Sequence, residues 1–186
     1  MTQIGRPLAG EYAEYYERYI TLVPAGDLVT ILERQGAGIS SLLGSLTEAQ
    51  GDHRYAPEKW TIRELVGHVT DTERVFSYRA AHISRADPAP LPSMDQNTWW
   101  AGAESARRTL ASLAEELAAV RASTVALVKS LSPVQAMRRG IASGNEVTVR
   151  ALAYLCAGHA EHHLRILRER YLSALAIWRS GEPPCS

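Results

Sequence analysis

The chain has 186 residues with 20 acidic and 20 basic side chains, so its formal charge is zero. A chain of this length commonly builds one core, and we expect one domain over residues 1–186. Without a net positive charge to hold phosphates, nucleic acid and membrane partners are not expected. No basic and apolar leader opens the chain and no apolar run approaches the roughly 20 residues that cross a bilayer, so we expect a cytoplasmic protein.

The first half of the chain has the apolar spacing of helices. Apolar residues recur every three or four positions, and segments rich in Gly, Pro, Ser and Asp separate these stretches. A short helix is predicted over about 11–22, followed by a long helix over about 27–46 with Asp27 as its N-cap. A second long helix is predicted from Thr61 to about residue 85, because Thr61 and Glu64 can exchange hydrogen bonds in a capping box.

Prolines and glycines set the boundaries in the second half. Residues 87–92 include three prolines, which lack an N–H and clash with a preceding helical turn, so this segment must be a loop. A third long helix is predicted over about 103–131 and a fourth over about 148–171. Residues 138–146 contain two glycines and predict a turn or short hairpin. Four long helices favour a helical bundle, in which ligand sites are built from inward side chains.

Three of the six histidines, His159, His162 and His163, lie within five residues. At about 100° per residue, His159 and His163 fall near the centre of the apolar stripe of the fourth helix, and His162 falls on its flank. Side chains at i and i+4 have Cβ atoms about 5–6 Å apart, close enough for both imidazoles to bind one ion. One core histidine is usually satisfied by hydrogen bonds, but two adjacent imidazoles need a common partner, which a metal supplies.

A third ligand must come from another helix. His68 is the best candidate because it lies inside the well-capped second helix, although its place on the shoulder of the apolar stripe permits a ligand without requiring one. His82 lies further along that helix, and His53 lies in a loop expected at the surface. Asp71, one turn after His68, is either a hydrogen-bond acceptor for its free ring nitrogen or a solvated surface charge.

Two other metal motifs of helices do not fit this sequence. A zincin places a glutamate directly after its first histidine, whereas Glu161 lies two positions after His159, about 200° around the helix. A di-iron site needs Glu-x-x-His on two helices, and the sequence lacks such a pair. The two cysteines, Cys156 and Cys185, are too few for a disulfide framework, so we expect reduced thiols outside the site.

Two segments carry a resemblance to a known family. Residues 60–73, WTIRELVGHVTDTE, and residues 158–164, GHAEHHL, resemble the DinB/YfiT-like superfamily, whose pattern is a Trp-Ser/Thr helix start, a histidine two turns later and a His-x-x-x-His near the end. The likeness covers about residues 27–171. It implies an all-α, up-and-down four-helix bundle, often a homodimer, that holds zinc or nickel on His68, His159 and His163.

The resemblance also implies reactions on small molecules. Relatives include bacillithiol S-transferases and a mycothiol-dependent maleylpyruvate isomerase. Three neutral histidines leave an open metal position, and a coordinated thiol becomes the nucleophilic thiolate. Our first hypothesis is that the chain transfers a low-molecular-weight thiol of the bacillithiol type to an electrophilic small molecule. The alternatives are a metal-dependent hydrolase that lowers the pKa of a bound water and a metal-binding bundle without catalysis.

Overall fold

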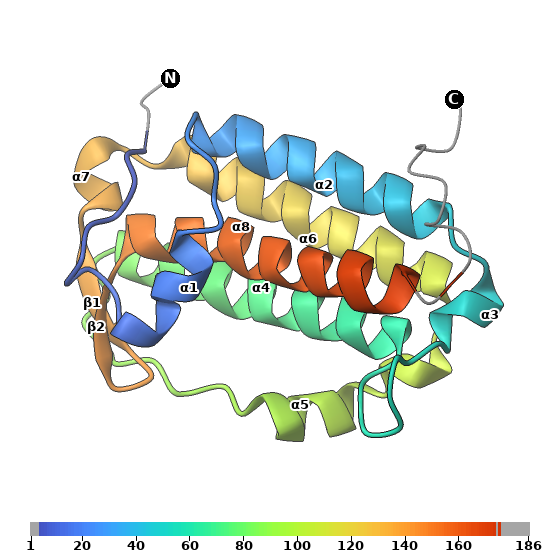
Figure 1. Cartoon of the computed structure of the whole chain (residues 1–186). Helices are drawn as coiled ribbons and strands as arrows, with labels where there is room; N and C mark the ends of the chain where they lie inside the picture. The colour runs from blue at the N-terminus through green and yellow to red at the C-terminus, as the bar shows by residue number, and fades with distance from the viewer. Residues whose placement is uncertain (1–3, 174, 176–186) are drawn as a thin grey trace.

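The computed structural model describes residues 4–173 and residue 175. Within this part of the chain, four long helices lie side by side and form the predicted all-α four-helix bundle (Figure 1). The last of them continues through a π-helical segment, Leu167–Leu172. No helix in the described part of the chain combines the length and the apolar character that a membrane span requires. The long helices are α2 (Leu28–Gly44), α4 (Ile62–Ser84), α6 (Leu110–Ser130) and α8 (Val149–Ile166).

The helices pack in an order that differs from their order in the chain. Helix α4 packs mainly against α8 and α6, and α2 packs against α6 and α8. Helices α2 and α8 run in one direction and α4 and α6 in the other (Figure 1). The directions are therefore up, down, down, up, and not the alternating up-and-down order that the resemblance implied, because the connection 85–109 returns along the length of the bundle before α6 begins.

The predicted caps of the first two long helices are confirmed. The carboxylate of Asp27 accepts a hydrogen bond from the N–H of Thr30 at 2.8 Å. The N–H of Glu64 donates to the hydroxyl of Thr61 at 3.2 Å, and the N–H of Thr61 donates to the Glu64 carboxylate at 2.7 Å. These bonds satisfy N–H groups that have no partner inside the helix. The start of α4, and with it the position of its histidine, is thereby fixed.

The predicted start of the third long helix at about residue 103 is wrong. Residues 96–103 form a separate helix, α5 (Gln96–Ala103), which ends where Glu104 adopts a left-handed backbone with φ of 48°. A 3-10 turn (Ser105–Arg107) follows, and Thr109 caps the real start of α6 by accepting from the N–H of Ser112. The left-handed residue Glu104 therefore separates α5, which was not predicted, from a helix α6 that begins later than expected.

The N-terminal helix is also shorter than predicted. A 3-10 turn (Glu14–Tyr16) leads into α1 (Glu17–Ile20), which lies across α8. Two further short helices, α3 (Glu48–Gly51) and α7 (Pro133–Ala136), follow α2 and α6.

The predicted hairpin is confirmed at the start of α8. Strands β1 (Arg139–Ala142) and β2 (Asn145–Thr148) pair antiparallel. Ser143 and Gly144 both have positive φ, 53° and 74°, as a two-residue hairpin turn requires. The N–H of Leu91 donates to the carbonyl of Ile141 at 2.9 Å, which attaches the α4–α6 connection to the hairpin.

A polar layer divides the core into two apolar clusters. One cluster lies toward the hairpin and includes Phe76 and Leu155, and the other lies toward the opposite end and includes Leu65 and Leu164. Between them, α4 and α8 carry buried polar side chains, including the pair formed by Glu73 with an arginine of α6. The candidate site lies at this level of the bundle.

Candidate metal centre

The structure brings the three predicted histidines together. The Nε2 atom of His159 lies 3.2 Å from Nε2 of His68 and 3.1 Å from Nε2 of His163. The ligand atoms of all three residues lie within 4.8 Å of one another. Two nitrogens bound to one tetrahedral zinc at about 2.0–2.1 Å would lie about 3.3–3.4 Å apart. The two shorter spacings thus fit a shared ion with small adjustments.

Hydrogen bonds alone do not satisfy this cluster. Nε2 of a neutral imidazole offers either one N–H or one lone pair, so His159 can pair well with only one of its two neighbours. In addition, Nδ1 of His163 is buried without a hydrogen-bond partner among the described residues. Unpaired buried polar groups cost about 1–3 kcal/mol each, so the arrangement is better suited to a metal than to a hydrogen-bonded core.

Burial keeps all three imidazoles neutral. The exposed fractions are 8% for His68 and 5% for His159, and His163 is half-buried. Burial is the main cause that lowers the pKa of His68 to about 4 and of His163 to about 3, and neighbouring imidazoles add to it. The pKa of His159 lies well below its ordinary value of 6.5 for the same reasons. Metal ligands must be unprotonated, and these are unprotonated at pH 7.

Two glycines allow the surrounding chain to approach the histidines. A Cβ on Gly67, beside His68, would lie 2.1 Å from Oγ of Ser105, in the turn before α6. A Cβ on Gly158, beside His159, would lie 2.2 Å from the carbonyl oxygen of Tyr19 in α1. The α4–α6 connection and α1 can therefore cover the histidines from two sides.

Aromatic side chains hold two of the imidazoles in place. The ring centroid of Trp60 lies 4.7 Å from that of His68, and Tyr19 meets His159 edge-on at 5.4 Å. Phe76 lies 6.0 Å from His159 on the cavity side. Sequence reasoning missed the role of Tyr19, although the tyrosines at positions 15, 16 and 19 lie on the turn spacing of a short helix.

The remaining histidines lie outside the cluster. His162, predicted on the flank of the helix, meets the ring of Tyr19 at 5.2 Å. Nε2 of His82 lies 3.1 Å from the carbonyl oxygen of Ala89, and His53 packs near the ring of Tyr171.

In the described part of the chain, neither Asp71 nor Glu161 contacts the three clustered histidines. The Asp71 carboxylate forms an ion pair with the guanidinium of Arg74 at 3.3 Å. Its partner in the structure is therefore Arg74 and not His68. Glu161 faces away, as predicted, and accepts from Gln35 at 3.3 Å. The Cys156 thiol is buried in the core, and burial raises its pKa. Cys185 lies outside the described residues.

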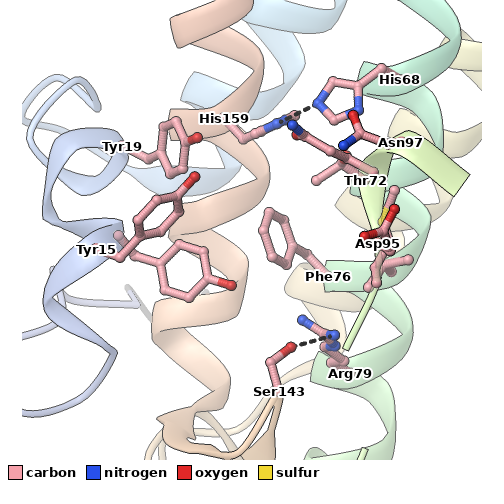
Figure 2. A pocket seen from close by; sticks show the side chains of 14 residues that line it. Tyr15, Tyr19, His68, Thr72, Phe76, Arg79, Asp95, Asn97, Ser143 and His159 are labelled. Carbon is pink, nitrogen blue, oxygen red and sulfur yellow. Dashed lines mark hydrogen bonds between the residues drawn. The ribbon is translucent and has the colours of Figure 1, made fainter. Parts of the chain in front are cut away.

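A cavity of about 390 Å³ opens beside the cluster and extends toward the hairpin. Figure 2 shows His68 and His159 at one end and Arg79 and Ser143 at the other. Its volume is in the range of small-molecule sites. The described residues that line it are Tyr15, Tyr16, Tyr19, His68, Thr72, Val75, Phe76, Arg79, Met94, Asp95, Gln96, Asn97, Ser143 and His159.

Comparison with known proteins supports the fold. The solved structure of YfiT from Bacillus subtilis, described as a probable metal-dependent hydrolase with an unusual four-helix bundle topology, matches with a TM-score of 0.71. The match has 19% sequence identity and covers 79% of this chain and 85% of YfiT. No curated protein matches this chain significantly. The model of the DinB superfamily matches residues 31–167, a span that contains all three clustered histidines, and the chain therefore belongs to the DinB superfamily.

Proposed function

We propose that this chain is a metal-dependent enzyme that binds one divalent ion, zinc or nickel, through His68, His159 and His163. In this proposal it transfers a low-molecular-weight thiol to an electrophilic small molecule. The observation that carries the proposal is the convergence of three neutral Nε2 atoms beside a cavity, with no carboxylate among them in the described residues. Three neutral ligands leave the charge of the ion uncompensated, which favours an anionic further ligand.

When bound, such an ion lowers the pKa of a thiol or a water molecule that takes its remaining position. The protein contributes the positioning. Because burial already holds the imidazoles neutral, no ligand proton has to leave at pH 7 before an ion binds. Trp60, Tyr19 and Phe76 restrict the rings and exclude water from their apolar sides.

Neutral polar groups line the cavity next to the histidines. Figure 2 shows Thr72 and Asn97 beside His68, and Tyr15 and Tyr19 on the opposite wall. Hydroxyl and amide groups can donate and accept hydrogen bonds without adding charge. These side chains are suited to orienting a small polar co-substrate at the metal.

The chemistry of the cavity favours thiol transfer over hydrolysis. Among the described residues, its one carboxylate belongs to Asp95, which accepts the N–H of Thr98 at 2.7 Å as the N-cap of α5. Hydrolysis of an amide or ester gains from a general acid for the leaving group, and the described lining offers no uncommitted carboxylate for this role, only tyrosine hydroxyls. A thiolate that displaces a stable anion such as a halide forms a carbon–sulfur bond as the carbon–halogen bond breaks, and the departing anion needs no proton from the protein.

Metal-dependent hydrolysis is the second candidate. It is supported by the description of YfiT as a probable metal-dependent hydrolase, and a site of three histidines also suits an activated water. The two candidates differ in one requirement, because transfer depends on an added thiol and hydrolysis does not.

Cobalt substitution tests the proposal directly. The cobalt protein is titrated with bacillithiol, mycothiol and glutathione, and we expect thiolate charge-transfer absorption in the near ultraviolet with at least one of them. A His162→Ala variant serves as the control, since His162 lies outside the cluster, and should give the same response. A cobalt spectrum that does not change with any of the thiols but changes with acetate or a hydroxamate would favour the hydrolase.

A further inference from the structure

Arg79 is a buried cation at the end of the cavity that lies away from the histidines. It belongs to α4 and is 5% exposed. Its Nη2 donates to the carbonyl of Pro92 at 2.7 Å and to the hydroxyl of Ser143 at 2.9 Å. Both acceptors are neutral. Among the described residues, no carboxylate lies within 4.0 Å of its guanidinium.

The other deeply buried arginine, Arg121, is paired with a carboxylate. Arg121 donates from Nε and Nη2 to the two carboxylate oxygens of Glu73, both at 2.7 Å. Buried charges are normally paired in this way, because an unpaired charge in a core is costly. Arg79 stays charged at pH 7 although burial lowers its pKa. The fold thus leaves one buried guanidinium without a counter-charge, on the wall of a cavity.

The position of Arg79 relates it to the histidines. It follows His68 by eleven residues on the same helix, which corresponds to about 16 Å along the axis. Thr72 and Phe76 lie between them and line the same cavity (Figure 2). Both bonds to the protein use Nη2, so Nε and Nη1 remain as donors for an acceptor in the cavity, near the hydroxyl of Tyr16.

We infer that Arg79 binds a carboxylate group of the substrate, while the reacting part of that molecule lies at the three histidines. The inference rests on the proposed function, because it assigns a substrate class to the same cavity. Arg79 acts as a binding and orienting residue. A molecule held at both ends would present one fixed atom to the metal, which is the kind of positioning that accelerates a reaction.

The charges of the cavity favour a carboxylate over a phosphate. Asp95 lines the same cavity, and the N–H of Thr98 holds its pKa below the ordinary value, so it is negative at pH 7. The charges of Arg79 and Asp95 cancel, so a bound carboxylate leaves one negative charge in the cavity. A phosphate group with nearly two charges would leave about twice as much.

The test compares a carboxylate with its neutral amide. Hexanoate and hexanamide are titrated calorimetrically into the full chain as purified, with its zinc content measured. We expect the wild type to bind hexanoate about tenfold or more tightly than hexanamide. Arg79→Gln, which keeps a donor for Pro92, should remove this preference while zinc content stays unchanged. Arg79→Lys should keep only part of it, because an ammonium keeps the charge but cannot place donors where Nε and Nη1 lie.

The matched control is Arg74→Met, which removes a positive charge from the same helix outside this cavity and should keep the wild-type preference. A preference for hexanoate that survives in Arg79→Gln would place the carboxylate on the metal and overturn the inference. The absence of any preference in the wild type would do the same, as would tighter binding of hexylphosphonate.

If Arg79→Gln does not fold, the same comparison in Arg79→Lys decides, and an unchanged preference there contradicts the assignment. The metal proposal fails independently, through loss of zinc binding in the wild type.

Discussion

Single residues next to the histidines decide whether the site can form. Gly158 precedes His159 and faces the carbonyl oxygen of Tyr19, where an added Cβ would lie 2.2 Å away. Backbone cannot swing aside as a flexible side chain can, so α1 has to move to accept any larger residue. This glycine contributes to covering the metal centre as well as to packing.

We predict that Gly158→Ala destabilises the fold by about 1–3 kcal/mol through overpacking. Gly38→Ala is the matched control, because Gly38 is an exposed glycine of α2 with nothing within 4 Å of its added Cβ. Alanine there should stabilise by up to about 1 kcal/mol through helix propensity. Chemical denaturation measures both. Equal effects of the two substitutions would show that α1 does not pack as described.

Residue patterns predicted two of the candidate ligands and gave the third, His68, as the best candidate without requiring it. His159 and His163 follow from their spacing of four on an apolar stripe. His68 lies on the shoulder of its stripe, and its orientation depends on how α4 packs against α8. Periodicity along one helix does not show how that helix packs against another. The assignment of His68 therefore depended on the family resemblance, and the distances between the Nε2 atoms now support it.

At the scale of elements, one ion pair attaches the N-terminal segment to α8. The Glu11 carboxylate accepts from Nε of Arg150 at 2.6 Å and from the hydroxyl of Thr148 at 2.9 Å. These partners lower the pKa of Glu11 from 4.5 to about 2, with Arg150 as the largest cause. Because the folded pKa is lowered, the stabilisation is present above about pH 4.5 and is lost as the pH falls toward 2.

We predict that Glu11→Gln lowers the free energy of unfolding at pH 7 by about 1–3 kcal/mol. The difference between wild type and variant should shrink as the pH falls from 4.5 to 2, because protonation of Glu11 then removes the same charge from the wild type. Urea denaturation at several pH values measures this. Glu14→Gln, an exposed residue of the same segment, should show no comparable difference. A difference in the free energy of unfolding between wild type and Glu11→Gln that stays constant down to pH 2 would contradict the role given to Glu11.

Sequence reasoning found the long helices better than their connections. The caps at Asp27 and Thr61 depend on local side chains and were predicted. The start of α6 was placed too early because the break at Glu104 depends on a left-handed backbone in a residue that rarely adopts it. The contacts that favour the true start of α6 come from Glu48, whose carboxylate accepts from the N–H of Leu110 at 2.8 Å, far away in the sequence.

At the scale of the whole molecule, the bundle brings together groups that are distant in the chain. The direction of α6 was not predictable, since a connection as long as residues 85–109 can return along the bundle or turn sharply at its end. That return places Met94, Asp95 and Asn97 on the wall of the cavity. The homodimer implied by the resemblance stays a prediction.

The metal content of the purified protein tests the central claim most directly. Elemental analysis should find one zinc or nickel ion per wild-type chain and per His162→Ala chain. It should find nearly none in His159→Ala or His163→Ala, since each loses one of the three converging Nε2 atoms. Circular dichroism must show that these variants remain helical. A full equivalent of metal in folded His159→Ala would contradict the assignment of the site.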